Sequence, residues 1–452
     1  MTYVEEYITR AKAAQKAIEH YTQPQVDALV KAMGKIIFDH AEELSREAVE
    51  ETGYGTVESK VLKHRKCTLA AWFYLHDKKS VGAIENDPVN QLVTYAKPVG
   101  VVAALVPTTN PTSTTVSNGM SIIKCRNAMI VSPHPRAVKV TTHCVELIRD
   151  AIGALGAPRD LVQIIDQPSM DTTHELMAKA DVVVATGGSA MVKAAYSSGR
   201  PSYGVGQGNV QVVLADDYTD LAFMAKTIIG SRAYDNGLPC TGEQAIHAPE
   251  GKVDAVIKAL LENGAALLTP EQAKAFETFQ FKENGAINPV HVGMTAHALA
   301  KEVGASVPED AKVLIFRSLG MTNENLLRKE KLNPVIQIFP YKTYEEGVAN
   351  AKANLEWEGI GHSAVVYTND SARAEYAGEQ LPVSRVLVNQ PGGAASGGNL
   401  INGLNPTMSL GCGSWGNNSI SENLTYKHLM NTTRLAYFHP STLPSPEKVW
   451  EL

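Results

Sequence analysis

Short β-branched runs alternate with amphipathic helical segments through most of this 452-residue chain, and that alternation limits the folds open to it. The runs that predict strands before residue 215 are 99–106, 128–131, 161–165, 181–185 and 210–214. Helical segments at 145–152 and 173–179 separate the later runs. A regular succession of strand, helix and strand favours a mostly parallel sheet with helices on both faces.

The N-terminal part of the chain predicts helices up to about residue 80. Thr22 and Gln25 have the spacing of a capping box, ahead of apolar residues spaced i, i+3, i+4, i+7. After a Gly-rich stretch at 199–209, a second series of elements begins. It predicts helices at 219–229, 253–262 and 344–355 and strands at 312–316, 335–339, 363–367 and 385–389. The simplest partition is two α/β lobes that meet near the Gly-rich stretch, followed beyond Pro391 by an ordered loop system.

The charge balance and the cysteines exclude several classes of protein. The chain has 41 Lys and Arg against 47 Asp and Glu, without a long block of one sign, which argues against a general nucleic-acid binder. Its five cysteines are scattered and never form C-x-x-C, so no disulfide framework or cysteine metal site is predicted. The longest apolar run is shorter than the ~18 residues of a membrane span, and Glu5 and Glu6 interrupt any export signal. We therefore expect a cytoplasmic protein without a metal and without nucleic-acid or membrane partners.

The strongest local signal surrounds Cys240. It ends the segment DNGLPC at 235–240, in which a turn-forming Asn-Gly precedes the cysteine, and a strand at 244–247 follows. A cysteine on exposed backbone beside such a turn can present a thiolate to a ligand. The alternative is a small buried hydrophobic side chain, which describes most cysteines.

A second motif, PTTNPT at 107–112, directly follows an apolar strand. Open α/β sheets bind their ligands at this end of a strand, and the Asn110 amide can donate a hydrogen bond to a developing oxyanion. An ordinary Pro-rich turn is the alternative. Metalloprotease, P-loop and serine hydrolase motifs are absent from the sequence.

A third motif is the Gly-Gly turn after the strand at 181–185. Thr186, Gly187, Gly188 and Ser189 lead into a helical segment, and free N–H groups at a helix start can bind a phosphate. Taken alone, such a turn is structural at least as often as it is functional.

Together these motifs resemble the CoA-acylating branch of the aldehyde dehydrogenase superfamily, from about residue 5 to the C-terminus. The segments that carry the resemblance are PTTNPT at 107–112, SPHPRA at 132–137, VVATGG at 183–188, AAYSSGRPSYGVG at 194–206, DNGLPC at 235–240 and GCGSWGNNSISEN at 411–423. Within this branch the last segment and the Trp-Glu-Leu end are most similar to acylating succinate-semialdehyde dehydrogenases. The chain is also similar to the aldehyde dehydrogenase half of bifunctional aldehyde/alcohol dehydrogenases.

The resemblance implies roles for individual residues. Cys240 is the nucleophile, and Asn110 with the Cys240 backbone N–H forms the oxyanion hole. The implied dinucleotide-binding positions are Ser132 and His134 at the adenosine ribose, Thr186, Gly187, Gly188 and Ser189 at the pyrophosphate, and Glu330 at the nicotinamide ribose. His362 is a candidate proton carrier for coenzyme A, and a purely structural histidine is the equal alternative.

One segment departs from the family's hydrolytic members. They carry Glu-Leu-Gly-Gly, whose Glu activates water, where this sequence reads GVGQG at 204–208. Without that base a Cys240 thioester is expected to resist water and to react with the thiol of coenzyme A. Because Ser132 and His134 replace the usual Lys and ribose-binding Glu, no carboxylate is expected to repel a 2′-phosphate, and NADP(H) and NAD(H) both remain open.

The implied reaction interconverts succinyl-CoA and succinate semialdehyde, with acetaldehyde, propanal and sulfoacetaldehyde as alternative substrates. For an anionic acyl group, the loop 392–399 is expected to offer N–H groups and hydroxyls from Ser396, Gly397 and Gly398. Glycines that only shape a loop are the alternative. A catalytically silent dinucleotide-binding protein is a third hypothesis, against which the joint presence of the motifs speaks.

By the same resemblance the fold is α/β and aldehyde dehydrogenase-like, with two Rossmann-like lobes and a small β oligomerisation element. The expected domains are a dinucleotide-binding domain at 1–208, a catalytic domain at 209–425, and an oligomerisation strand and tail at 426–452. The oligomerisation element combines a hairpin near 91–104 with a strand near 432–438, and a homodimer is expected.

Overall fold

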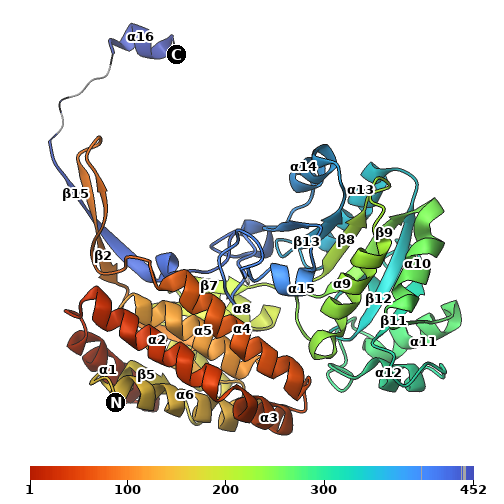
Figure 1. Cartoon of the computed structure of the whole chain (residues 1–452). Helices are drawn as coiled ribbons and strands as arrows, with labels where there is room; N and C mark the ends of the chain where they lie inside the picture. The colour runs from red at the N-terminus through yellow and green to blue at the C-terminus, as the bar shows by residue number, and fades with distance from the viewer. Residues whose placement is uncertain (399, 439, 441–443, 452) are drawn as a thin grey trace.

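The structure is a computed structural model that describes residues 1–398, 400–438, 440 and 444–451. It contains two α/β lobes and a small antiparallel sheet that projects from the first lobe (Figure 1). The α/β class expected from the sequence is confirmed.

Four helices open the first lobe: α1 (Tyr3–Ala17), α2 (Gln23–Asp39), α3 (Ala41–Thr52) and α4 (Val57–Leu75). The expected capping box of Thr22 and Gln25 begins α2. Gly53, with a φ of 71°, ends α3 in the left-handed conformation that favours glycine. Helix α2 packs on α4, α5 and α6, so one side of this lobe carries two layers of helices.

The first sheet has five parallel strands in the order β5 (Val162–Ile164), β4 (Ala128–Ser132), β3 (Val101–Leu105), β6 (Val182–Thr186) and β7 (Ser202–Val205). The helices between them are α5 (Pro111–Lys124), α6 (Val138–Gly153), α7 (Met170–Lys179) and α8 (Ser189–Tyr196). The chain leaves β3 for β4 on one side and later returns to β6 on the other. The strand order therefore reverses at β3, which is the switch point of this sheet.

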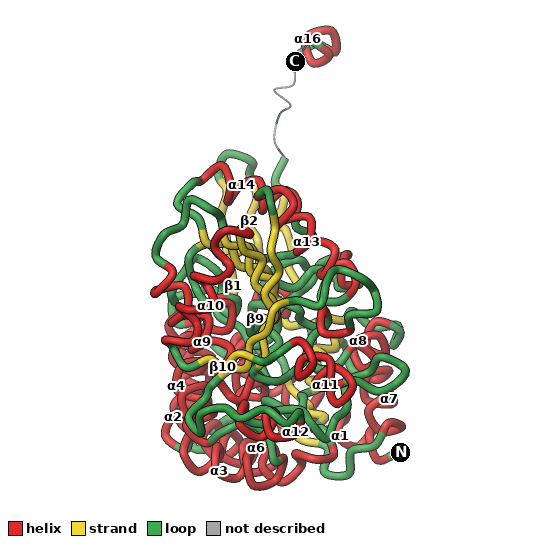
Figure 2. The backbone as a smooth tube through the Cα atoms, turned by 90° about the vertical axis from the view of Figure 1, so that its right-hand side faces the viewer, coloured by secondary structure: helices red, strands yellow, loops and turns green. Residues whose placement is uncertain are grey.

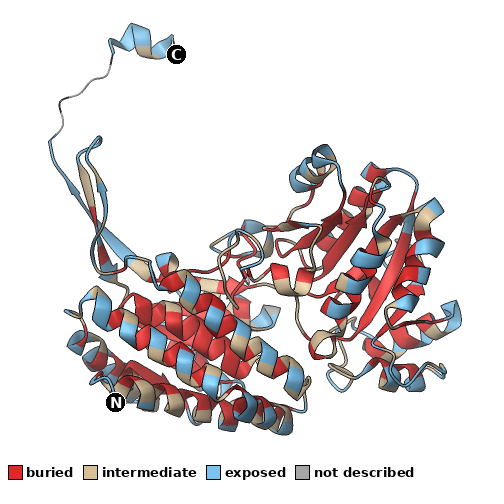
Figure 3. Ribbon diagram, viewed as in Figure 1, coloured by how far each residue is buried: buried red, intermediate tan, exposed pale blue. Residues whose placement is uncertain are grey.

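The second sheet has seven parallel strands in the order β10 (Ala265–Leu267), β11 (Val313–Arg317), β12 (Val335–Tyr341), β9 (Glu243–Pro249), β8 (Val210–Leu214), β13 (Ala364–Tyr367) and β14 (Val386–Val388). Its helices are α9 (Leu221–Ala233), α10 (Val253–Glu262), α11 (Pro270–Gln280), α12 (Ala296–Glu302), α13 (Tyr344–Trp357), α14 (Ser371–Gln380) and α15 (Gly392–Ala395). Val212 and Leu214 of β8 pack with α9 and α10, whereas Val213 packs with α13. Because alternate strand residues point to opposite faces, this sheet is buried on both faces (Figure 3).

The third sheet is antiparallel, in the order β1 (Gly82–Asp87), β2 (Leu92–Pro98) and β15 (Met430–Ala436). The hairpin therefore lies over 82–98 and not over 91–104, since residues 101–105 form β3 of the first sheet. The two strands differ in exposure, because β2 alternates between exposed and buried residues, whereas β3 is buried throughout. Gly100, with a φ of 118°, turns the chain between the two strands.

The C-terminal part of the chain returns to the first lobe. Leu424, Tyr426 and Leu429 are buried in the hydrophobic core of that lobe, and Asn127 Nδ2 donates to Leu429 O at 2.8 Å. The expected division between residues 425 and 426 thus falls inside a segment that packs as one piece.

The division expected after residue 208 falls in the loop between β7 and β8, where the chain passes from the first sheet to the second. Helix α16 (Pro446–Trp450) lies away from both lobes in Figures 1 and 2. Among the described residues, no helix combines the length and the apolar character that crossing a membrane requires.

Candidate active site

Three of the predicted motifs meet at the switch point of the first sheet. Leu105, the last residue of β3, pairs with Ser132 of β4 and with Ala185 of β6. The loop that leads to Asn110, the Ser132 strand end and the Thr186 turn therefore share one carboxyl edge of the sheet. Open α/β sheets bind their ligands at this position.

The Gly-Gly turn leaves its backbone open to a bound group. Thr186 ends β6 with its Oγ1 2.9 Å from Ser409 Oγ, and Gly188 is the N-cap of α8, which Ser189 begins. A Cβ atom placed on Gly188 would meet nothing within 4 Å, and one on Gly187 would meet nothing closer than 3.8 Å. This open helix N-terminus fits the pyrophosphate of a dinucleotide.

Ser132 and His134 differ in exposure although both stand at the end of β4. Ser132 is buried, with its Oγ 3.0 Å from Thr173 Oγ1. His134 is exposed, and its Nδ1 accepts from the Arg136 backbone N–H at 3.1 Å. Partial desolvation of the ring and the neighbouring Arg136 lower the pKa of His134 below its usual range, which favours a neutral imidazole.

A carboxylate that the motifs did not reveal also borders this strand end. Glu51 of α3 accepts from the backbone N–H groups of Lys139 and Val140, at the start of α6. The expectation that no carboxylate repels a 2′-phosphate stays a prediction, and Glu51 is a carboxylate that α3 brings to the start of α6. The residues after β4 thus include one cation, Arg136, while one anion, Glu51, binds the start of α6.

Cys240 lies in the turn between the 3-10 segment η3 (Tyr234–Gly237) and strand β9. Asp235, Asn236 and Gly237 have φ values of 52°, 54° and 71°. Two of these three residues are not glycines, so the turn ahead of the cysteine holds backbone strain that its surroundings must maintain. Such strain is common where a side chain must be presented to a ligand.

The glycine segment at 204–208 packs directly behind Cys240. A Cβ atom on Gly208 would lie 2.0 Å from Cys240 O and 2.9 Å from Cys240 Cβ. One on Gly206 would lie 3.2 Å from Cys412 Sγ. Gln207, between these glycines, lies close enough to Glu330 to lower the pKa of that carboxyl group. The segment thus brings glycine and an amide, and no carboxylate of its own, up to the nucleophile.

The surroundings of Cys240 disfavour its thiolate. Burial raises the pKa of the Cys240 thiol to about 12, and the charges of Glu330 and Cys412 act in the same direction. Arg385 acts in the opposite direction. It is buried, it donates to His362 O at 2.8 Å, and it pairs with no carboxylate in the described part of the chain. At neutral pH the thiol is protonated in this state, so the thiolate has to form as ligands bind.

Glu330 has a free buried oxygen. The residue is 3% exposed, and its Oε1 has no hydrogen-bond partner in the described part of the chain. Burial and the neighbouring Glu358 raise the pKa of Glu330 to about 8. An unpartnered buried carboxyl oxygen needs a donor, and a ribose hydroxyl is a donor of the right kind. The residue therefore fits the ribose-binding position expected for it.

His362 is fully buried, and neither ring nitrogen has a partner among the described residues. Burial, with a smaller effect of Arg385, lowers the pKa of His362 to about 3, so the ring is neutral at pH 7 and a weak base. The structure places it beside Arg385, and the choice between a proton carrier and a structural histidine stays open.

The loop expected to bind an anionic acyl group uses most of its donors internally. Residues 392–395 form the short helix α15, in which Gly392 N–H donates to Glu243 Oε1 at 2.7 Å. Ser396 Oγ donates to Gly392 O at 2.8 Å, and Gly398 N–H donates to Ala395 O at 3.0 Å. Ser396 Oγ and the Gly398 N–H thus have partners within the loop, and binding of an anionic acyl group by this loop stays a prediction.

The rest of this loop is placed by its neighbours. Gly397 accepts from the Thr407 N–H at 3.1 Å, and Gly393 accepts from Thr241 Oγ1, one residue after the nucleophile, at 3.1 Å. Asn399 lies outside the described residues. The loop thus packs beside the nucleophile turn and supports it.

Helix α4 supplies three groups that the motifs did not single out: the buried Lys60 and His64 and the half-buried Lys63. Their spacing of i, i+3 and i+4 places them on one helix face. This spacing of polar residues along one helix face is the signal by which the sequence could have indicated them. Lys63 contacts both Asn110 and Asp235, and so lies within the candidate site.

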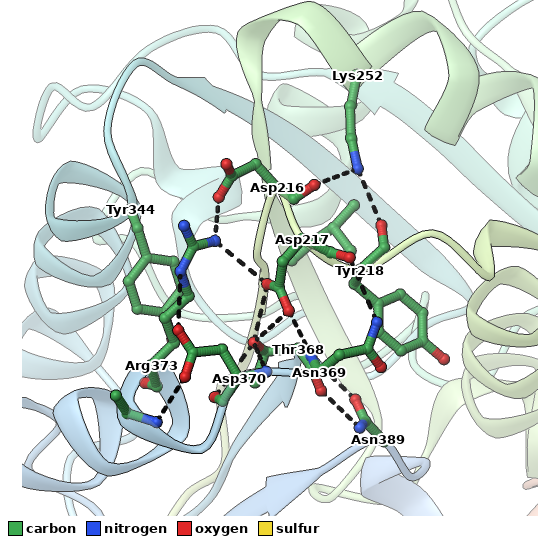
Figure 4. Close-up of polar contacts among 12 residues, drawn as sticks. Asp216, Asp217, Tyr218, Lys252, Tyr344, Thr368, Asn369, Asp370, Arg373 and Asn389 are labelled. Carbon is green, nitrogen blue, oxygen red and sulfur yellow. Dashed lines mark hydrogen bonds and ion pairs between the residues drawn. The ribbon is translucent and has the colours of Figure 1, made fainter.

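A second polar cluster lies at the opposite edge of the second sheet (Figure 4). Asp216 and Asp217 follow β8, and both carboxylates contact Arg373 of α14. Asp217 also accepts from the Asn369 N–H, after β13, at 2.6 Å. Cys240 precedes β9, at the amino edge of these parallel strands, whereas the cluster lies at their carboxyl edge. Its charges pair with one another, and it joins β8, β13 and α14.

Comparisons with known proteins show the family of the chain. The model of the aldehyde dehydrogenase family matches residues 2–420. A succinate-semialdehyde dehydrogenase (acetylating) of Clostridium kluyveri is 48% identical over 99% of this chain and 98% of its own length. A sulfoacetaldehyde dehydrogenase of an Acholeplasma species is 40% identical, over 98% of this chain and 93% of its own. The crystal structure of an acetylating aldehyde dehydrogenase from Geobacillus thermoglucosidasius superposes with a TM-score of 0.94, at 36% identity, over 98% of each chain. The chain therefore belongs to the aldehyde dehydrogenase family, in its acylating branch.

Proposed function

We propose that this acylating aldehyde dehydrogenase interconverts succinate semialdehyde and succinyl-CoA, with NAD(H) or NADP(H), through a thioester on Cys240. The observation that carries this proposal is the turn at 206–208, which packs against Cys240 and carries Gln207. A side-chain amide cannot take a proton from water at neutral pH. The thioester therefore awaits a nucleophile that ionises more readily than water, and the thiol of coenzyme A is one.

Besides Gln207, Glu330 also lies near the nucleophile, and the charge of its carboxyl group raises the pKa of the Cys240 thiol. Its pKa of about 8 keeps it mostly protonated at pH 7, and it becomes a candidate base for water as the pH rises toward that value. The argument for acyl transfer to a thiol therefore rests on Gln207.

The residues of the site support a short sequence of steps. The Cys240 thiolate attacks the aldehyde carbonyl, and the Asn110 amide with the Cys240 backbone N–H binds the oxyanion that forms. A bound nicotinamide dinucleotide would accept the hydride that leaves this carbon. The acyl group then remains on Cys240 until the coenzyme A thiolate attacks it and the Cys240 thiolate departs. Because one thioester replaces another, the last step is nearly balanced and the enzyme should run in both directions.

The dinucleotide would be held by the residues already placed at the first sheet's carboxyl edge. The open turn at Gly187 and Gly188 suits its pyrophosphate, and the free Glu330 oxygen suits its nicotinamide ribose. The exposed Arg136 beside His134 supports NADP(H), whereas Glu51 opposes a further anion. Both dinucleotides are therefore proposed as cofactors.

The choice of succinate semialdehyde rests on the relative from Clostridium kluyveri, whose name gives that substrate. The relative named for sulfoacetaldehyde, also an anionic aldehyde, favours a second candidate substrate. In both cases the aldehyde carries a distal negative charge. Comparing the rates with anionic and neutral aldehydes of equal length separates these two candidates from acetaldehyde and propanal.

The deciding experiment measures nicotinamide reduction with succinate semialdehyde, with and without coenzyme A, using NAD and NADP separately. We expect steady turnover only with coenzyme A, and at most about one equivalent of reduced cofactor per site without it. A Cys240→Ala variant is the control and is expected to lose both signals. Equal rates without coenzyme A would mean that water deacylates Cys240, and would refute the argument from Gln207.

We also propose a homodimer and a cytoplasmic location. Strand β15 is an open sheet edge whose residues after Met430 are exposed, and open edges favour pairing with another chain. The described cysteines are free thiols, which supports a reducing compartment. Light scattering on the purified enzyme tests the dimer directly.

A further inference from the structure

Asn110 occupies a helix N-cap position without capping the helix. It precedes Pro111, the first residue of α5, yet its side chain makes no hydrogen bond to the backbone N–H groups of that helix. An N-cap Asn usually accepts such a bond. Here Asn110 Oδ1 instead accepts from Lys63 Nζ of helix α4, and Nδ2 donates to Thr109 Oγ1 at 3.2 Å.

The same ammonium group contacts the nucleophile turn. Lys63 Nζ lies 2.8 Å from Asp235 Oδ2, five residues before Cys240 and in the strained part of the turn. Asp235 is fully buried, and Lys63 is 10% exposed. One cation of the first lobe therefore joins the proposed oxyanion donor to the turn that presents the nucleophile in the second lobe.

Neighbouring groups complete this ion cluster. Lys60 Nζ lies 3.3 Å from Asp235 Oδ2 and donates to Thr109 O at 3.0 Å. The Thr56 N–H donates to Asp235 Oδ1 at 3.0 Å. The two lysines outweigh the effect of burial and hold the pKa of Asp235 below its usual range, so the carboxylate stays ionised at neutral pH.

An ammonium group can only donate hydrogen bonds, so it selects the oxygen of the Asn110 amide and not the nitrogen. This fixes the orientation of the amide and directs Nδ2 away from Lys63. Nδ2 carries two N–H groups, and the bond to Thr109 uses one of them. The other is available for a substrate oxygen. A cation on the amide oxygen also withdraws electrons from the amide and makes the N–H groups stronger donors.

We propose that Lys63, anchored by Asp235, is a positioning residue that orients and polarises the Asn110 amide for the oxyanion formed on Cys240. This inference rests on the proposed function, because it takes Asn110 to be the oxyanion donor. It predicts that Lys63 acts on steps that develop an oxyanion and has little effect on other chemistry of Cys240.

Two assays on the full-length enzyme separate these kinds of chemistry. The first measures kcat and KM for CoA-dependent oxidation of succinate semialdehyde. The second measures the rate at which iodoacetamide alkylates Cys240, a displacement that forms no oxyanion. The variants are Lys63→Met, Lys63→Arg, Asn110→Ala and the double variant Lys63→Met/Asn110→Ala. Lys66→Met, an exposed lysine on the same helix, is the matched control.

We expect Asn110→Ala to lower kcat on the order of 100-fold, the usual effect of removing one oxyanion donor. Lys63→Met should lower kcat on the order of 10- to 100-fold, and the double variant should be no slower than Asn110→Ala alone. Lys63→Arg, which keeps the charge and the donors, should recover most of the activity. The alkylation rate should stay within about threefold of the parent enzyme in all of them, and Lys66→Met should match the parent in both assays.

Three results would overturn the role of Lys63: a Lys63→Met enzyme with normal kcat, effects of Lys63→Met and Asn110→Ala that multiply, or a parallel loss of alkylation. If Lys63→Met does not fold, Lys63→Gln, judged by the same two assays, takes its place. A parent enzyme without CoA-dependent turnover, or a fully active Asn110→Ala enzyme, would instead refute the proposed function or the proposed role of Asn110.

Discussion

Gly208→Ala tests directly whether the glycine segment sets the position of the nucleophile. The added Cβ would lie 2.0 Å from Cys240 O, and real Cβ contacts essentially never fall below 3.0 Å. The nucleophile turn or the glycine segment must therefore move by about 1 Å. A displacement of this size in a reacting group lowers the rate by about 100-fold, equivalent to about 2.7 kcal/mol of activation free energy.

The assay is kcat for CoA-dependent aldehyde oxidation, with circular dichroism to confirm that the fold is retained. Gly230→Ala is the matched control, since a Cβ there meets nothing within 4 Å. Gly206→Ala should have a smaller effect than Gly208→Ala, because its nearest contact is the Cys412 Sγ atom at 3.2 Å, which can rotate. A Gly208→Ala enzyme whose kcat lies within about threefold of the parent would show that the turn tolerates the shift, and would refute the argument.

Three further predictions concern charges in the site. The negative charge of Glu330 raises the pKa of the Cys240 thiol, and Glu330 itself ionises near pH 8. Glu330→Gln should therefore increase the rate at which iodoacetamide alkylates Cys240 more at pH 9 than at pH 7. Superimposable pH profiles of the two enzymes would contradict this. Asp235→Asn leaves buried lysines unpaired and should lower the free energy of unfolding by about 3 kcal/mol at pH 7. Because the folded-state pKa of Asp235 is depressed, its contribution is present above the unfolded pKa and is lost as the pH falls through the folded pKa, so urea midpoints of the two proteins should converge in acid. Arg136→Ala should lower kcat/KM for NADP about tenfold, or about 1.4 kcal/mol, and leave kcat/KM for NAD unchanged. An equal loss with both dinucleotides would show that Arg136 does not bind the 2′-phosphate.

Much of the fold could be predicted because its central strands are continuous apolar runs. Strands β3, β4, β6, β8, β11, β12 and β13 lie within two residues of the runs that predicted them. The sequence runs do not predict strands β1, β7 and β10. The sequence of β7, SYGV, includes a glycine and has no strand periodicity, and the strand exists because it pairs with β6 at the edge of the sheet. Whether such a segment forms a strand depends on its pairing in the tertiary structure, which the local sequence does not reveal.

The residues of the candidate site also fall into two groups, those that the local sequence indicates and those that only the tertiary structure brings together. Cys240 and Asn110 lie in compact motifs, so a local reading of the sequence finds them, whereas Glu330 is named only through the family resemblance. The contact between Lys63 and Asp235 joins residues 172 positions apart, and it exists only because α4 packs against η3. The same limit explains Glu51, which reaches the start of α6 from a helix 88 positions earlier. Long-range ion pairs of this kind carry no local pattern.

The order in which the two lobes finish folding follows from the segment 424–429. A ribosome makes the first sheet early, but the core of that lobe still lacks Leu424, Tyr426 and Leu429, and β2 still lacks its partner β15. The second lobe needs no strand beyond Val388. The lobe that is synthesised first is therefore completed last, after nearly the whole chain has emerged. A nascent chain halted near residue 420 would lack these three side chains, so the part of the first core that they cover would stay exposed to water until they emerge.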